Sequence, residues 1–567
     1  MTQDSAVGKR ITRIDAVGKV TGKALYAADI ILPDMLHGKI LRSPYAHANI
    51  RRIDTSKAQA LEGVMAVITV ADVPDKKMMS DSPYAMQPLL AFQRVMYEGQ
   101  PVAAVAARTP YIAEEALKLI EVDYEVLPCV IDVMEAIKPD APVLHDDDQA
   151  GNLPEKSSNL KNVFCYYENN IGDIDAGFRE ADIILENTYH TQVVHHGQLE
   201  PRAAVANVDP QGKITVWSDN QSIFVVRDLV AEFMDVPLTN VNAVNVTVGG
   251  AFGAKEPQPV APICALLSSK TGRPVRIVTT REETFKDSHP TPATVTTVKM
   301  GATKEGKIAA VSITMFYDYG CLHGVAGLMD APQSVFTGPG QYRIPNLHIE
   351  SYSVFTNKAA SGPYRAPTAA QGAFSMESQI DLLARELNMD PIDLRLKNVA
   401  QQGDLMLMTA SGFGPVGFKE TLERMKQYLA EHPKPTGENR GRGIACAYWS
   451  PALASASANV VLNLDGSVQL FVGSTDISGA HTSLAQIAAG ELGIPVEKVT
   501  VGMVDTNTAP YGCVSVGSGV VLNTATAISR ACEDLKEQLC QRGADYLGLE
   551  RADVENIQID SLFRKEG

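Results

Sequence analysis

The sequence lacks the segments that would export the protein or anchor it in a membrane. Its amino terminus, MTQDSAVGKRITRID, has no apolar stretch of the kind found in secretory signals. No run approaches the roughly 18 consecutive apolar residues that a membrane span needs. Basic residues are outnumbered by acidic ones, 50 against 66, and form no stripe, so the net charge of −16 argues against nucleic acid as a partner. We therefore expect a cytoplasmic protein.

Cysteine is scarce and unclustered. The chain has eight cysteines and no CxxC or plant-type iron–sulfur spacing, at positions 129, 165, 264, 321, 446, 513, 532 and 540. This scatter predicts buried, reduced thiols and no iron–sulfur cluster in this chain. A cluster needed for redox chemistry would then belong to a different polypeptide.

One stretch is unusually poor in side chains. In VGGAFGAKEPQ, residues 248–258, three glycines and two alanines surround a single phenylalanine. Glycine is used where the backbone takes unusual dihedral angles or approaches another group closely. No Gly-Lys-Ser/Thr follows, which excludes a phosphate loop, and the spacing does not match the GxGxxG of dinucleotide-binding folds. We expect a large group to lie against this main chain.

At 567 residues the chain is too long for one core. Strand-like and helix-like patterns alternate throughout, which predicts an α/β (α+β) protein. Proline-, glycine- and acid-rich stretches divide it into residues 1–130, a linker 131–155, residues 156–405, a linker 406–435 and residues 436–567.

The clearest expected elements lie in all three regions. The strands are expected at 63–70, 100–107, 212–221, 455–473 (a hairpin turning at Asp465-Gly466) and 494–506. Helices are expected at 109–125, 369–391, 482–493 and 523–539. In the second helix Phe374, Ile380, Leu383, Ala384 and Leu387 share one apolar face, and in the third Thr482 is the expected N-cap and Gly493 the C′ residue.

Longer patterns resemble the xanthine dehydrogenase and aldehyde oxidase family, in family order. Its hammerhead domain is resembled by DAVGKVTGKALYAADI (15–30), LHGKILRSPYAHANI (36–50) and YEGQPVAAVAA (97–107). Its first molybdopterin-binding domain is resembled by HHGQLEPRAAVANV (195–208), VGGAFGAKE (248–256) and the segment from YRAPTAAQGAF to LRLKN (364–398). The start of its second such domain is resembled by residues 474–499 and by DTNTAPYGCVSVGSG (505–519). The resemblance implies a hammerhead domain followed by two molybdopterin-binding domains, the second incomplete.

The resemblance also implies a cofactor and residues that line it. In the family, molybdenum is held by the dithiolene of a molybdopterin, here expected as the cytosine dinucleotide, and not directly by protein side chains. By position, Phe252 and Gly253 would lie against the metal centre, and Arg365 would reach its oxygen ligands. A surface ion pair is the alternative for Arg365. Gln371 and the SVGS segment from Ser515 to Ser518 align more loosely with cofactor-lining positions.

Glu256 matches the glutamate that binds a heterocyclic substrate in the purine-oxidising branch. Its alternative is a helix N-terminal acid favoured by the helix dipole. The implied activity is oxidation of a CH group in an N-heterocycle or an aldehyde, with oxygen from water. Electrons would pass to 2Fe-2S and FAD on separate subunits.

Four departures from the family pattern are visible. Val194 stands where a glutamine often contacts the oxo ligand, and Ser478–Ala480 (SGA) replaces a GQG turn. Pro367 replaces a ring-stacking phenylalanine, and MDAPQSVF (329–336) lacks a substrate-binding arginine, so xanthine itself is doubtful. The family's general-base glutamate is expected beyond Gly567, which leaves no catalytic residue of that kind in this sequence.

Three alternatives therefore stay open. A second molybdopterin subunit could supply the missing part, or the chain is a truncated, non-catalytic remnant. A subunit of the carbon monoxide dehydrogenase or hydroxybenzoyl-CoA reductase type is the other enzyme alternative. The first of these should carry a reactive cysteine beside the metal, and YRAP (364–367) contains none.

Overall fold

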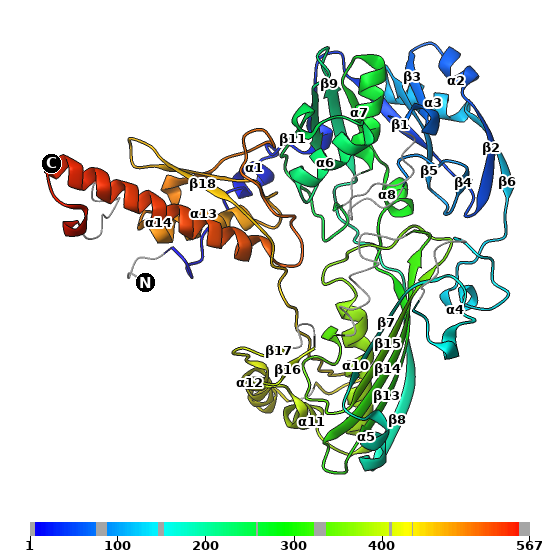
Figure 1. Cartoon of the computed structure of the whole chain (residues 1–567), viewed down its shortest axis with the longest axis vertical. Coiled ribbons are helices and arrows are strands. Elements are labelled where there is room, and N and C mark those ends of the chain that lie inside the picture. Colours follow the sequence, from blue (N-terminus) through cyan, green and yellow to red (C-terminus); the bar gives the residue numbers. More distant parts are fainter. Residues whose placement is uncertain are drawn as a thin grey trace.

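A computed structural model describes residues 6–74, 88–145, 152–256, 259–322, 336–407, 411–433 and 435–554, and every structural statement below concerns these residues. Three bodies are visible in Figure 1: an upper lobe, a lower lobe and a third unit that extends to the side. No helix in the described parts is both long enough and apolar enough to cross a bilayer.

The upper lobe contains a seven-stranded mixed sheet built from two separated parts of the chain (Figure 1). Its order is β11-β10-β9-β12-β1-β5-β3, with β10–β11 and β12–β1 parallel and the other pairs antiparallel. Its strands are β1 (Leu36–Arg42), β3 (Val64–Thr69), β5 (Pro101–Ala107), β9 (Ala203–Val208), β10 (Ile214–Ser218), β11 (Val241–Val244) and β12 (Val275–Val278). Residues on both sides of the first expected linker thus share one sheet.

Helices cover both faces of this sheet, which explains why every residue of the alanine-rich β5 is buried. Helices α6 (Ile223–Phe233) and α7 (Val260–Thr271) pack into the core of one face, and α2 (Ser56–Ala60) and α3 (Pro110–Lys118) into that of the other. A side sheet of order β4-β2-β6 consists of β2 (Ala48–Asp54), β4 (Arg94–Val95) and β6 (Glu121–Val126). The short helices are α1 (Ala16–Val20), η1 (Ala27–Asp29), η2 (Val70–Asp72), η5 (Leu238–Asn240) and α8 (Arg281–Lys286).

The lower lobe is a five-stranded sheet of order β7-β15-β14-β13-β8, in which only β14 and β15 are parallel. Its strands are β7 (Val163–Ile171), β8 (Ile183–Thr191), β13 (Ala293–Ala302), β14 (Ile308–Gly320) and β15 (Leu347–Phe355). Helix α10 (Ala369–Glu386) packs against β13 and β8. The remaining elements are α4 (Val133–Ala136), η4 (Glu155–Ser157), α5 (Ile174–Glu180), α11 (Pro391–Asn398), β16 (Leu405–Met406), β17 (Ser411–Gly412) and α12 (Phe418–Glu431).

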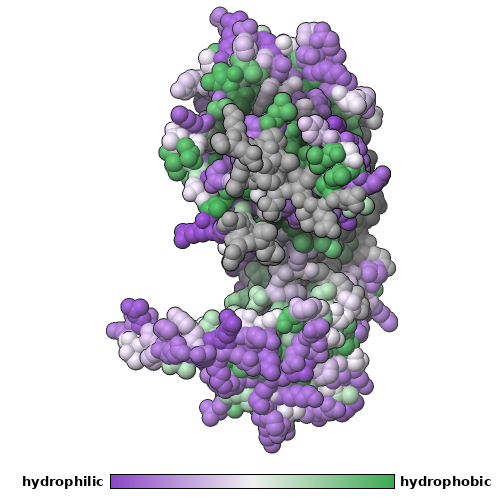
Figure 2. All heavy atoms as spheres, turned by 90° about the vertical axis from the view of Figure 1, so that its left-hand side faces the viewer, coloured by the Kyte–Doolittle hydropathy of each residue, from purple (hydrophilic) through white to green (hydrophobic). Residues whose placement is uncertain are grey.

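The third unit packs two helices on a three-stranded sheet of order β18-β19-β20. Its elements are β18 (Ala458–Leu462), β19 (Val468–Val472), α13 (Ala480–Leu492), η6 (Val496–Lys498), β20 (Val499–Val501), α14 (Val520–Leu547) and η7 (Arg551–Asp553). The amides of Asn245 and Thr506 bond across to the carbonyls of Val504 and Ala243, which joins the unit to β11. Figure 2 views the molecule from this side and shows hydrophilic residues over most of the lower part, with hydrophobic residues gathered higher up.

Several sequence-based expectations about the elements need correction. The helix expected at 109–125 ends at Lys118, and β6 follows because its residues pair with β2. Phe374 is 48% exposed and does not share the buried face of α10, where Ile380 and Leu383 lie. Helix α13 begins at Ala480 after a left-handed Gly479, so Thr482 is not its N-cap, although Gly493 does end it in a left-handed conformation.

The cysteines also differ in part from expectation. All eight are free thiols, and five of them are buried, at positions 264, 321, 513, 532 and 540. Cys129 is exposed, while Cys165 and Cys446 are half-buried. The expectation of uniformly buried thiols was therefore wrong for three positions.

Candidate functional site

The glycine-rich stretch forms a loop between β11 and α7. Gly250 and Gly253 have φ angles of 93° and 106°, and Phe252 between them has φ 58°. A Cβ atom on Gly253 would lie 1.9 Å from the carbonyl oxygen of Pro363, so no other residue fits there. The Arg365 amide donates to the Phe252 carbonyl at 2.9 Å, which fixes the YRAP segment against the loop. The structure therefore brings together Phe252, Gly253 and Arg365, as the sequence predicted.

Unfavourable backbone conformations are concentrated in this area. Ten described non-glycine residues have positive φ, and five of them are Asn or Asp, which tolerate the left-handed region. The other five all lie in the glycine-rich loop, the YRAPT segment and the two turns of the third unit: Phe252, Ala366, Thr368, Ser478 and Ser518. Each such residue costs about 1–3 kcal/mol and persists only where surrounding contacts hold it. Strain of this kind is typical of ligand-binding sites.

The loop presents main-chain donors that the protein does not use. Within the described residues, the N–H groups of Gly250, Ala251 and Phe252 have no hydrogen-bond partner. The Phe252 side chain is 42% exposed, and Arg365 is exposed as well. Ala251 is fully buried and Gly250 is half-buried, so these three amides lie in a partly buried loop without a protein acceptor among the described residues.

A buried ionic network supports the loop from beneath. The Lys255 side chain is fully buried, and its ammonium lies 2.5 Å from Glu200 Oε2 and 3.0 Å from Asp219 Oδ2. The same Glu200 oxygen accepts the Gly249 amide at 2.6 Å. Burial and the nearby Asp219 carboxylate raise the pKa of Glu200, although Lys255 opposes this shift. Arg202, also buried, donates to the Ala254 carbonyl, so both cations bind where the loop turns toward α7.

A buried glutamine, Gln221, links this loop to the third unit. Its Oε1 accepts the amides of Gly253 and Lys255 at 3.1 and 3.2 Å, and its Nε2 donates to the Ser515 carbonyl at 2.8 Å. The Ser515 Oγ donates to the Thr475 carbonyl at 3.1 Å. Ser515 was among the site residues predicted from the sequence, but Gln221 was not. The only sequence feature that could have indicated Gln221 is its position shortly after the buried strand β10.

Three helices begin beside these loops, and in none of them does the N-cap residue itself supply a side-chain cap. They are α10 after Thr368, α13 after Gly479 and α14 after Gly519. The first follows the YRAPT segment, and the other two follow the turns that Ser515 joins to Gln221. Helix N-termini carry a partial positive charge that favours anions. In α13, however, the first three amides are already bonded, to the Ile477 carbonyl, Asp476 Oδ1 and the Gly479 carbonyl. Ser518, exposed with φ 59°, lies just before α14.

Two histidines, His289 buried and His196 half-buried, lie behind the YRAP segment. His196 Nε2 lies 2.8 Å from the Pro363 carbonyl, and burial, the largest cause, lowers the pKa of this histidine to about 4. Burial likewise lowers the pKa of His289 to about 3. Both are therefore neutral at pH 7, and each has a buried Nδ1 without a partner in the described part of the chain.

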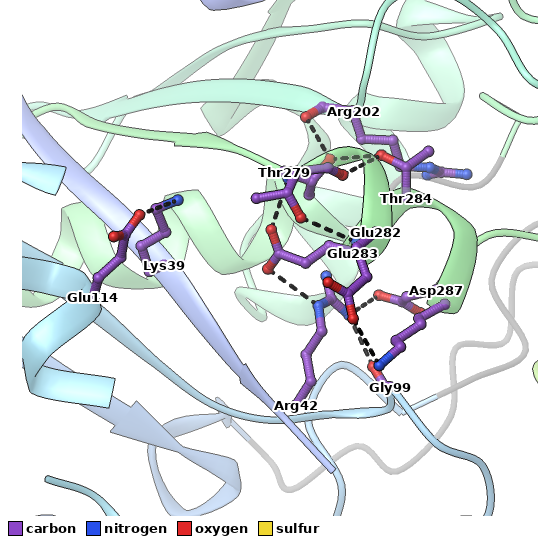
Figure 3. Close-up of polar contacts among 12 residues, drawn as sticks. Lys39, Arg42, Gly99, Glu114, Arg202, Thr279, Glu282, Glu283, Thr284 and Asp287 are labelled. Atoms are coloured by element: carbon purple, nitrogen blue, oxygen red, sulfur yellow. Dashed lines mark hydrogen bonds and ion pairs between the residues drawn. The ribbon is translucent and has the colours of Figure 1, made fainter. Parts of the chain in front are cut away.

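A polar cluster, drawn in Figure 3, anchors the segment that carries His289. Arg42 of β1 donates to Asp287 Oδ2 at 2.5 Å, to Glu283 Oε1 at 3.3 Å and to the Gly99 carbonyl at 3.0 Å. Thr279 donates to the Arg202 carbonyl at 3.0 Å. The first region of the chain thereby fixes α8 and the residues that follow it toward the site.

Glu256 ends the loop as a buried carboxyl group. It is 5% exposed, and burial alone raises its pKa to about 8. Its Oε2 has no hydrogen-bond partner among the described residues. A carboxyl group in this state is protonated at neutral pH and can both donate and accept a hydrogen bond.

The other positions named from the sequence show fewer features that point to a ligand. Gln371 is buried, and its Nε2 donates to Thr291 Oγ1 and the Pro292 carbonyl at 2.7 and 3.2 Å, so its amide nitrogen already has protein partners. Val194 is 44% exposed and pairs with Thr291. All but the last residue of MDAPQSVF, 329–336, lie outside the described residues.

The donors at this site fit an anionic, oxygen-rich cofactor. Three unused amides, an exposed guanidinium and the positive ends of the helix dipoles all favour negative oxygen atoms. At Gly253 the space that a Cβ would take is filled by the Pro363 carbonyl, so this glycine lets the YRAP segment approach the loop closely. These residues would hold the oxygen ligands and phosphate groups of a molybdenum–pterin.

Comparison with known families agrees with this chemistry. Residues 21–128 match the aldehyde oxidase and xanthine dehydrogenase a/b hammerhead domain. Residues 155–399 and 419–565 each match a molybdopterin cofactor-binding domain.

Relatives and a solved structure extend the match to nearly the whole chain. A probable xanthine dehydrogenase subunit of Bacillus subtilis is 32% identical over 94% of this chain and 71% of the relative. The nicotinate dehydrogenase large molybdopterin subunit of Eubacterium barkeri is 34% identical over 75% of this chain and 96% of the relative. The structure of Cu,Mo-CO dehydrogenase superposes with a TM-score of 0.82 at 29% identity, covering 97% of this chain and 74% of that one. The chain belongs to the family of molybdopterin-binding large subunits of xanthine dehydrogenase-type molybdenum hydroxylases.

Proposed function

We propose that this chain binds molybdopterin for an enzyme that oxidises a CH group of an N-heterocycle or an aldehyde. The observation that carries the proposal is the row of three unused amides at Gly250–Phe252, next to the exposed Arg365. When bound, the cofactor supplies transfer of a water-derived oxygen and accepts two electrons. The chain's own part is to bind the oxygen ligands through these amides and to neutralise their charge through Arg365.

Glu256 is proposed as the substrate-binding residue. A protonated carboxyl group donates to a ring nitrogen, and its carbonyl oxygen accepts from a ring N–H, so it suits a purine-like or nicotinate-like heterocycle. Pro367 stands where purine oxidisers carry a ring-stacking phenylalanine, and residues 329–336 lack their substrate-binding arginine, which favours a heterocycle other than xanthine. Arg365, Phe252, Gly253, Ser515 and Ser518 remain the proposed cofactor contacts, with Gln371 as a support for the segment.

The proposal extends to partners and to the form of the cofactor. We expect the cytosine dinucleotide form of molybdopterin, and 2Fe-2S and FAD on separate subunits. A second molybdopterin subunit is a further expected partner. Exposed hydrophobic residues on the third unit, Val461, Leu464 and Met503, offer such a subunit a contact surface.

The test is molybdenum and pterin content of the complex purified with its partner subunits. Wild type should carry about one molybdenum per chain, and Arg365→Met should lose most of the metal or most of kcat. Arg385→Met, which removes an exposed arginine from α10, is the matched control and should behave as wild type. A metal-free wild-type complex, or full metal content and turnover in R365M, would contradict the proposal.

Substrate class is tested by steady-state kinetics with nicotinate, purines and aldehydes. Glu256→Met, which removes both the donor and the acceptor, should raise KM roughly tenfold or more for the preferred heterocycle, the scale of one buried hydrogen bond to substrate. It should leave KM for aldehydes unchanged. Equal effects on both substrate classes would remove Glu256 from substrate recognition.

A further inference from the structure

A cavity of about 570 Å³ lies in the lower lobe, at the end of its sheet that is remote from the cofactor-facing loops. Strand β13 begins at Ala293, next to the Pro292 carbonyl that Gln371 contacts, and runs to Ala302. The turn between β13 and β14 then brings Lys307 to the cavity. The ten residues of this strand span about 33 Å, so the cavity is separate from the site described above.

The floor of the cavity is apolar and belongs to the packed core of the lobe. Leu347 is 1% exposed, and three further lining residues pack against the same core: Ile171, Ile344 and Leu407. Leu405 of β16 also lines the cavity and is 46% exposed. Small-molecule sites have volumes of about 300–1,000 Å³ and mainly apolar walls, so this cavity has the size and the lining of such a site.

Three cationic side chains line the same cavity, those of Lys307, Arg343 and Lys397, and all three residues are exposed. Lys307 and Lys397 have no ion-pair partner among the described residues, while Arg343 Nε lies 3.7 Å from Asp404 Oδ2. Two ammonium groups beside an apolar floor are therefore available to an anionic group of a ligand.

The two carboxylates that line the cavity, those of Glu305 and Asp404, are already hydrogen-bonded. Asp404 Oδ2 accepts the Gln401 amide at 2.8 Å. Hydrogen bonds from its own backbone amide and from Thr303 hold the pKa of Glu305 below its ordinary value. Three cations against two engaged carboxylates leave the cavity positive, although the whole chain has a net charge of −16.

We propose that this cavity is a second ligand site, which binds a small molecule that has an apolar ring and a carboxylate. The ring lies on the floor formed by Leu347 and Ile344, and the carboxylate is bound by Lys307 and Lys397. An uncharged apolar ligand would leave both ammonium groups unused, and an inorganic anion would leave the apolar floor in water. The site does not depend on the molybdopterin, so its failure would leave the proposed function untouched.

Two probes separate the charge from the apolar part: 2-naphthoate has both features, and 2-naphthylmethanol has the same ring system without the charge. Each is titrated calorimetrically into the complete complex, without an electron acceptor. The double variant Lys307→Gln/Lys397→Gln removes both ammonium groups from the cavity. The matched control is Lys304→Gln/Lys419→Gln, which removes the same charge from two exposed lysines that do not line the cavity.

Wild type and the control should bind about one 2-naphthoate per chain. K307Q/K397Q should bind it about tenfold more weakly, the scale of two lost exposed charge pairs. The uncharged probe should bind to wild type more weakly than 2-naphthoate does, and with equal affinity to both double variants. Raising the ionic strength should weaken the binding of 2-naphthoate alone, and this measurement needs no variant.

The apolar wall is tested by Leu405→Asn, which should weaken the binding of both probes. Absence of 2-naphthoate binding to wild type would overturn the proposal. Equal affinity of 2-naphthoate for K307Q/K397Q and for the control would overturn it too, because the probe would then bind elsewhere on the complex. Unchanged binding of both probes in L405N would contradict it as well.

Discussion

The two loops that face the candidate site are stabilised by different physics. The glycine-rich loop rests on buried charges: the Lys255 ammonium between Glu200 and Asp219, and Arg202 on the Ala254 carbonyl. The turns of the third unit, at Ser478 and Ser515–Ser518, rest mainly on main-chain hydrogen bonds and on the helices that follow them.

This difference indicates a division of roles. Buried ion pairs are intolerant of any change that leaves one charge alone, so the first loop should respond strongly to single substitutions. Main-chain hydrogen bonds do not depend on side-chain identity, so the third unit's turns should tolerate substitution better. The glycine-rich loop is then the fixed half of the site, and the third unit is positioned relative to it.

The largest expected change in the free energy of unfolding comes from removing the buried Lys255 ammonium. Lys255→Met leaves Glu200 and Asp219 without their cation and should lower the free energy of unfolding by about 3–5 kcal/mol. Lys270→Met, which breaks an exposed pair between α7 and Asp72, is the control and should cost no more than about 1 kcal/mol. Chemical denaturation of both variants measures the difference. Equal losses in the two variants would remove the contrast between the loops.

The second largest expected effect is a pH dependence of the free energy of unfolding that is caused by Glu256. Its folded pKa of about 8 lies above the ordinary value of 4.5, so the folded state retains a proton that the unfolded state releases between these pH values. Stability should therefore fall by up to about 1.4 kcal/mol per pH unit as pH rises through this window. In Glu256→Gln this decline should disappear.

Histidine protonation acts in the opposite direction at lower pH. His196 and His289 have folded pKa values of about 4 and 3, below the ordinary 6.5, so the unfolded state binds protons first as pH falls. Stability should drop below pH 6.5, and the wild-type maximum should lie near pH 6–7. Denaturation curves from pH 5 to 8.5 test both slopes. A wild-type curve as flat above pH 6.5 as that of E256Q would contradict the buried, protonated state of Glu256.

The sequence predicted those features that depend on local residue types. The three glycines within residues 248–253 indicated that another group approaches the main chain closely there. Alternating or continuous apolar runs located strands such as β3, β5 and β10. The YRAP segment was placed at the site because its motif is long and specific. The family assignment from these motifs is confirmed by the family and relative matches.

Features that depend on long-range contacts could not be predicted. The upper sheet interleaves strands from residues 36–107 and 203–278, and no local pattern records which strands pair. In the sequence, Gln221 is one polar residue among several after a strand. Its side-chain hydrogen bonds to Gly253, Lys255 and Ser515 join residues 32, 34 and 294 positions apart, so no local pattern indicates them. Phe374 follows the helical period but is 48% exposed, with its ring edge-on to Tyr189 of β8 and not in the buried face of α10.

A smaller effect should come from relieving strain in the glycine-rich loop. Phe252→Gly removes a left-handed phenylalanine, which relieves about 1–3 kcal/mol of strain and costs about 0.5–1 kcal/mol of added chain entropy. The metal-free protein should become slightly more stable, while molybdenum retention should fall because the loop loses its fixed shape. Phe374→Gly, at a similarly exposed phenylalanine inside α10, should only destabilise. Thermal unfolding of the metal-free proteins and molybdenum content make the comparison.

The smallest expected change in stability and in molybdenum retention comes from a substitution in the third unit. Ser518→Gly relieves the same kind of strain as Phe252→Gly, and Ser518 lies before a helix whose first turn is fixed by its own hydrogen bonds. The stability of the metal-free protein should rise by no more than about 1 kcal/mol, and molybdenum retention should change less than in F252G. Melting temperatures and metal content of the two glycine variants, measured side by side, decide this. A loss of molybdenum in S518G as large as in F252G would show that the third unit's turn is held as tightly as the glycine-rich loop, and the division between a fixed and a positioned half would be wrong.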